Sequence, residues 1–129
     1  MLNKEIYKGA LGLLAELCDE QRTEDYRERA PYILANFICQ EEAHDAGYRR
    51  FYGEEVTPLK IGVFVSLDAE FPLSDRFAPA AEYYLASLLV DCEDSDRADT
   101  LFDRYCKAIT DILAQIPAMR EKILSAYAT

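Results

Sequence analysis

Residues 71–96, FPLSDRFAPAAEYYLASLLVDCEDSD, decide the fold of this chain. Ser74 or Asp75 can cap a helix, and the acidic run DCEDSD ends it. Between Tyr83 and Val90 only Ser87 is polar, so the predicted helix has no face suited to water. Such a helix must be covered on every side, either by other helices of the chain, by a ligand or by copies of the same protein.

The rest of the chain supplies helices that could cover it. The 129 residues fit a single domain, and we predict an all-α fold: a four- to five-helix bundle of two helix pairs with a short extended or β segment between them. Apolar residues spaced i, i+3, i+4 predict main helices at residues 3–18, 23–45, 74–92 and 95–116. Pro31 predicts a kink or a restart in the second helix. The N-caps expected for the helices at residues 3–18, 23–45 and 95–116 are Asn3, Thr23 and Ser95. A last short helix is expected around Met119, Ile123, Leu124 and Tyr127.

Residues 46–73 are the least helical part of the pattern and predict a loop or an extended arm. Glycine and proline interrupt them at five positions: Gly47, Gly53, Pro58, Gly62 and Pro72. Within them KIGVFVSL is rich in β-branched and aromatic residues, which favour a short strand. A lone strand cannot pair its own backbone groups, so we expect a partner, either residues 49–52 or another subunit.

The formal net charge of −10 argues against tight binding of nucleic acid, which needs clustered basic residues. No apolar run approaches the roughly 20 residues of a membrane span, and the N-terminus lacks a clear signal peptide, so we expect a cytoplasmic protein without membrane contact. Four cysteines without CxxC spacing predict free, mostly buried thiols, with a zinc site or a disulfide as the alternatives: Cys18, Cys39, Cys92 and Cys106.

Glu41 and His44 form the one pattern that resembles a metal site. Residues three apart share a helix face, but His44 is the only histidine, and a di-iron carboxylate site needs a second such pair. The surrounding QEEAHDA is typical of a solvated helix end. We therefore expect no metal, no cofactor and no catalytic residues, and a protein that is not an enzyme.

Aromatic and basic side chains are the candidate contacts with a partner protein. Stacking of the GYRRFYG aromatics on bases is the alternative that we consider weaker. Tyr83 and Tyr84 point about 100° apart on a helix, so one of them should meet a second surface. The full set is Tyr48, Arg49, Arg50, Phe51, Tyr52, Ile61, Val63, Phe64, Val65, Tyr83 and Tyr84.

The helix order and several segments resemble the small head–tail connector, or head-completion, proteins of tailed bacteriophage necks. The segments are ALGLLAEL, DYRERAPYILANF and FPLSDRFAPAAEYYLASLLVDCEDSDRADTLFDRYCKAI, which cover most of the chain. The resemblance implies a structural protein that forms a ring beneath the portal and has portal and tail proteins as partners. Its extended arm would contact the portal or neighbouring subunits, and the family has no catalytic residues to carry over. The strong acidity and the GYRRFYG loop depart from the pattern and leave the docking partner open.

The expected function is therefore that of a phage or prophage neck protein. It would be cytoplasmic in the host cell and then part of the virion neck. It would form a ring on the virion, although the isolated protein can remain monomeric until it meets a portal. The alternative is a small cytoplasmic helical interaction or regulatory module without catalysis.

Overall fold

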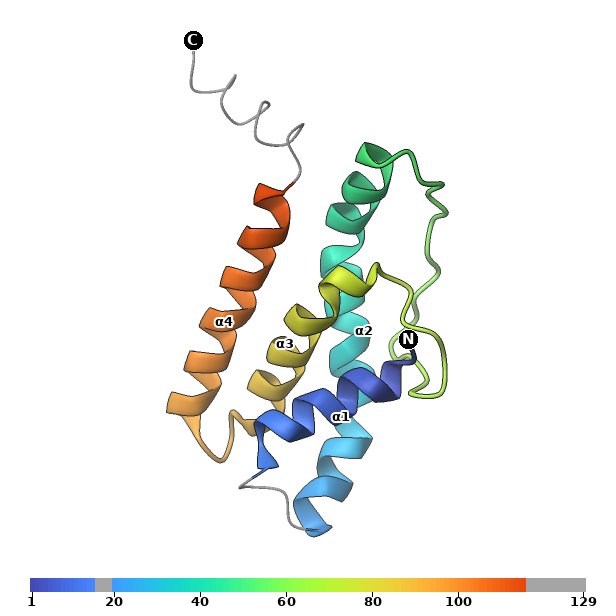
Figure 1. Cartoon of the computed structure of the whole chain (residues 1–129). Coiled ribbons are helices and arrows are strands. Elements are labelled where there is room, and N and C mark those ends of the chain that lie inside the picture. The colour runs from blue at the N-terminus through green and yellow to red at the C-terminus, as the bar shows by residue number, and fades with distance from the viewer. Residues whose placement is uncertain (16–19, 116–129) are drawn as a thin grey trace.

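The computed structural model describes residues 1–15 and 20–115 and confirms the all-α class. The elements are α1 (Asn3–Leu13), α2 (Glu20–Phe51), the short 3-10 helix η2 (Asp75–Phe77), α3 (Ala78–Val90) and α4 (Ser95–Ala114). In Figure 1, α2, α3 and α4 run roughly side by side and α1 crosses them obliquely. The expected short helix near residues 119–127 lies outside the described residues.

Helix α3 is covered by the chain's own helices, since α1, α2 and α4 all pack against it. Small side chains permit this close packing: Ala80, Ala81, Ala86 and Ser87 are all buried. The Ser87 hydroxyl, the polar exception in the apolar run, donates a 2.9 Å hydrogen bond to the carbonyl of Ala98 on α4. A buried hydroxyl paired in this way avoids the free-energy cost of an unsatisfied polar group.

Several helix boundaries differ from the prediction. Helix α1 ends at Leu13, well before residue 18, because the Leu14 N–H turns back to the carbonyl of Leu11. Helix α2 begins at Glu20, so Thr23 lies inside the helix and is not its N-cap. It also continues to Phe51, so residues 46–51 are helical despite Gly47.

The capping residues also differ from the prediction. Asp94, not Ser95, caps α4, and its carboxylate accepts from the Arg97 N–H at 3.0 Å. Asn3 is already the first residue of α1, where Leu2 is the N-cap. The Asn3 side chain is buried and donates instead to the carbonyl of Ser66 at 2.9 Å. Ser74 does precede the 3-10 turn that leads into α3, but its side chain makes no cap hydrogen bond.

Pro31 lies inside α2 without a restart, because the helix runs on from Glu20 to Phe51. Proline removes one backbone donor but keeps its carbonyl. That carbonyl accepts a 3.2 Å hydrogen bond from the Val65 N–H. The proline region of α2 thereby helps to hold the chain that connects α2 to α3.

The connecting segment, residues 52–74, forms no strand in the described part of the chain, which corrects the predicted β segment. Its only sheet-like pairing there is an isolated antiparallel bridge between Leu2 and Glu70. The N–H groups of Asn3 and Lys4 donate to the carbonyls of Ala69 and Leu67 at 2.9 and 2.8 Å. The expected partner, residues 49–52, is unavailable because residues 49–51 belong to α2 and residue 52 follows in a turn. The first residues of the chain pair with the segment instead. Figure 1 shows the segment looping back beside the N-terminus.

Candidate interaction site

The connecting segment turns some of its apolar side chains toward the core and others toward the surface. Ile61 and Val65 are half-buried and pack against the core, whereas Val63 and Phe64 are 78% and 59% exposed. The Phe64 ring contacts the ring of Tyr32 on α2, with centroids 5.7 Å apart. The outward residues form an apolar tip on a segment whose inward residues are fixed, so Val63 and Phe64 remain the best-placed of the predicted partner contacts.

The end of α2 divides into structural and exposed residues. Tyr48 is buried, and the Arg76 guanidinium lies 4.7 Å from its ring centroid. Arg49 is held within the molecule by Asp45, with Nε 2.8 Å from the carboxylate. The remaining predicted contacts of this group are on the surface: Arg50, Phe51 and Tyr52.

Tyr83 and Tyr84 do not form a joint surface. Tyr84 is 5% exposed and packs against the rings of Phe37 and Tyr105, at centroid distances of 5.6 and 5.0 Å. Tyr83 is half-buried and packs against the buried core residues. The second surface expected for this pair is therefore supplied, at least for Tyr84, by aromatic residues of α2 and α4.

A buried polar cluster joins the middle of α2 to α4, where the sequence predicted a solvated helix end. Glu41 is 3% exposed, and its Oε1 accepts a 2.7 Å hydrogen bond from the Tyr105 hydroxyl. Its Oε2 lies 2.6 Å from Nδ1 of His44, which is half-exposed. Both carboxylate oxygens therefore have partners, which is what burial of an ionised group requires.

Asp45 forms the second half of the cluster and fixes the start of α3. Its Oδ1 accepts from the N–H and the hydroxyl of Ser74, at 2.9 and 2.7 Å. Its Oδ2 accepts from Nε of Arg49 at 2.8 Å. Asp45 is 5% exposed, so these charge-assisted bonds lie largely away from water. Their effect is to hold the end of the connecting segment against α2.

The cluster shifts the ionisation of two tyrosines. Burial raises the pKa of the Tyr105 phenol strongly, and the hydrogen bond and negative charge of Glu41 raise it further. Burial also raises the pKa of Tyr84, against the opposing effect of the Gln40 amide that donates to its oxygen. Both phenols are therefore held protonated: Tyr105 donates to Glu41, and the Tyr84 oxygen accepts from Gln40.

The cluster offers little to a metal ion. Within residues 1–15 and 20–115 there is no group of three or more histidine, cysteine, aspartate or glutamate side chains placed to hold one. Glu41 and His44 instead satisfy each other and Tyr105. Cys39, Cys92 and Cys106 are free and exposed, which corrects the prediction of buried thiols, while Cys18 lies outside the described residues.

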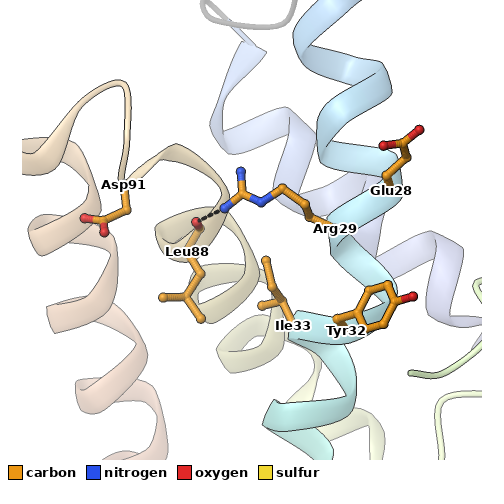
Figure 2. A pocket seen from close by; sticks show the side chains of 6 residues that line it. All are labelled: Glu28, Arg29, Tyr32, Ile33, Leu88 and Asp91. Carbon is orange, nitrogen blue, oxygen red and sulfur yellow. Dashed lines mark hydrogen bonds between the residues drawn. The ribbon is translucent and has the colours of Figure 1, made fainter. Parts of the chain in front are cut away.

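An open pocket of about 860 Å³ lies between α2 and the end of α3; we call it the α2–α3 pocket (Figure 2). Ile33 and Leu88, both half-buried, form its apolar part. Arg29 reaches across from α2 and donates to the carbonyls of Leu88 and Leu89 at 2.8 and 3.2 Å. The lining is completed by Glu28, Tyr32 and Asp91. Sequence reasoning missed this pocket, because nothing in the sequence pairs residues 28–33 with residues 88–91.

Among the described residues, no helix is both long enough and apolar enough to span a membrane. Comparison with known proteins identifies no family for this chain. No protein-family model, no curated protein and no solved structure matches the chain.

Proposed function

We propose that this protein is a structural neck component of a tailed bacteriophage or prophage, which binds the portal and neighbouring copies of itself and joins the capsid to the tail. In this role it works without catalysis. It is made in the host cytoplasm and becomes part of the virion neck. The proposal rests on the sequence resemblance together with a surface suited to protein contact.

The observation that carries the proposal is the apolar tip of the connecting segment. Val63 and Phe64 are 78% and 59% exposed, and among the described residues only the Tyr32 ring contacts the Phe64 ring. Exposed apolar side chains on a positioned loop are typical of protein–protein interfaces, where aromatic anchors contribute much of the binding energy. The segment also meets α1 through backbone hydrogen bonds, so binding there need not order a free chain.

On this proposal the gene should lie beside one for a portal protein, and the test is binding to that portal protein. The wild-type protein should co-sediment with portal rings, and V63S/F64S should bind at least about tenfold more weakly. The matched control is F102S, which removes a 41% exposed phenyl from α4 on the opposite side of the bundle (Figure 1). Deleting residues 56–66 is a poorer test, because Leu59, Ile61 and Val65 pack against the core.

Two results would contradict the proposal: no binding of the wild-type protein to the portal, or equal binding by V63S/F64S and F102S. Circular dichroism of each variant checks that the helices remain folded. A folded wild-type protein that ignores the portal would favour the regulatory module instead.

A further inference from the structure

We infer that the α2–α3 pocket binds a basic amphipathic helix of another protein. This inference goes beyond the neck role, because it depends on the pocket alone and would hold for a regulatory module as well. The pocket has an apolar floor and an acidic rim, and the one basic side chain in its lining is hydrogen-bonded within the protein.

The floor and its neighbourhood are apolar. Ile33 and Leu88 meet in the pocket, and Tyr32 beside them is 51% exposed. Tyr32 in turn contacts Phe64 of the connecting segment, which extends the apolar surface beyond the pocket. An amphipathic helix is suited to such an open surface, because residues three and four apart place several apolar side chains along one line.

The rim is acidic. Glu28 on α2 and Asp91 at the end of α3 both have exposed side chains. Figure 2 shows them on opposite sides of Leu88 and Ile33, so a helix lying on the floor would have a carboxylate on each flank. The end of α3 adds the negative pole of the helix dipole to this region.

The positive charge of Arg29 does not make the acidic rim basic. Its guanidinium donates to the carbonyls of Leu88 and Leu89 and to the carboxylate of Asp25 at 3.2 Å. These bonds commit it to the end of α3 and to its own helix. An anionic ligand would have to compete with them, whereas a cationic partner can use the exposed carboxylates of Glu28 and Asp91 on the rim.

At this pocket, charge favours a basic partner over a second copy. The exposed carboxylates of Glu28 and Asp91 would repel the acidic surface of another copy, whose formal charge is −10, and would attract a basic segment. A small molecule fits less well, because binding pockets for such ligands bury most of the ligand surface and this pocket is open.

The test uses a fluorescein-labelled helical peptide of about 18 residues, with leucine on one face and lysine on both flanks. Its binding to the full-length protein is followed by fluorescence anisotropy at two salt concentrations. The control peptides replace lysine by glutamate or scramble the order. We expect saturable binding of the lysine peptide alone, weakened by added salt.

Two charge-reversal variants locate the binding. E28K/D91K alters the rim, and E55K/D68K alters two exposed carboxylates that do not line the pocket. Each reversal changes the charge by two, so both variants carry −6 instead of −10. We expect E28K/D91K to bind at least about tenfold more weakly and the control to stay within about twofold of wild type. If E28K/D91K proves unfolded by circular dichroism, Y32S, a change at a half-exposed ring, takes its place with the same expectation.

The inference is overturned if the lysine peptide does not bind, if the glutamate peptide binds equally, or if both variants lose the same affinity. It is also overturned if sedimentation shows a self-associated wild type that the peptide dissociates, since a second copy would then occupy the pocket. The experiment contains no portal protein, so its failure leaves the neck proposal standing, and failure of the portal experiment leaves this inference standing.

Discussion

The Tyr105 hydroxyl on α4 donates a 2.7 Å hydrogen bond to Oε1 of Glu41 on α2, in the interior of the bundle. α2 and α4 also meet where the ring centroids of Phe37 and Tyr105 lie 6.0 Å apart. The polar bond fixes the register between two helices that aromatic packing alone would leave less specified. This relationship leads to the first two predictions.

Tyr105→Phe should lower the free energy of unfolding by about 1–3 kcal/mol. The ring is kept, but the buried Glu41 carboxylate loses its donor from α4 and retains His44. Urea unfolding measures the difference. Tyr32→Phe is the matched control, because it removes a hydroxyl from a residue that is 51% exposed and should change stability by less than about 0.5 kcal/mol. If the two substitutions lower the free energy of unfolding equally, the hydrogen bond to Glu41 does not contribute to stability.

Stability should also fall at alkaline pH because of the same phenol. In the unfolded chain tyrosine titrates near 10.0, and the fold raises the pKa of Tyr105 above that value. Between the two pKa values the unfolded chain has lost a proton that the native protein keeps, so the free energy of unfolding decreases as pH rises. Tyr84 contributes in the same direction.

The measurement is urea unfolding at several pH values from about 9 to 11. The wild-type protein should lose stability more steeply over this range than Tyr105→Phe, which has no phenol at that position to ionise. Parallel pH profiles for the two proteins would contradict the assignment of the alkaline loss to Tyr105.

Much of this fold can be predicted from the sequence, because the deciding signals are local. The apolar run of α3 required cover on every side, and the spacing of Leu101, Tyr105, Ile109 and Ile112 defines the buried face of α4. The end of α2 could not be predicted in the same way. Gly47 has the low helix propensity of a breaker, yet packing of Tyr48 continues the helix past it.

The buried polar cluster was missed although part of its signal is in the sequence. Leu34, Ile38, Glu41, Asp45 and Tyr48 follow one another at helical spacing and share one face of α2. Charged residues are rarely buried unless they are paired, so the two carboxylates suggest a solvated helix. Ser74, the partner of Asp45, lies 29 residues further along the chain, and Tyr105, the partner of Glu41, lies 64 residues further along. No local sequence pattern predicts pairs so far apart.

Asp45→Ala should loosen the connecting segment. It removes two hydrogen bonds that link α2 to Ser74 and one within α2 to Arg49, and leaves the arginine without its closest carboxylate. The Arg49 side chain is 29% exposed, so the cost should stay below the roughly 3–5 kcal/mol of breaking a fully buried charged pair. Limited trypsin digestion with mass spectrometry should then show faster cleavage after Lys60, which is exposed in that segment. Asp68→Ala, at an exposed residue of the same segment, should leave the cleavage rate near that of wild type; equal acceleration by both would refute the anchoring role.

Glu82→Gln should stabilise the protein at neutral pH. The Glu82 carboxyl packs against Gly9 of α1, where an added Cβ would overlap it. Burial raises the pKa of this carboxyl above its ordinary value of 4.5. Folding therefore disfavours the ionised form, and the glutamine removes the charge at a gain of less than about 1 kcal/mol, because the side chain is half-exposed.

The stability difference between the wild-type protein and Glu82→Gln should depend on pH. Below pH 4.5 the glutamate is protonated in both states, and the unfavourable effect of its charge is absent. As pH rises through the folded pKa the native protein must ionise a desolvated carboxyl, so its stability falls relative to Glu82→Gln. Thermal unfolding of both proteins should show a gap at pH 7 that closes as the pH approaches about 4. A gap of the same size at both pH values would mean that the amide changes packing and not ionisation, because only a titrating carboxyl makes the difference depend on pH.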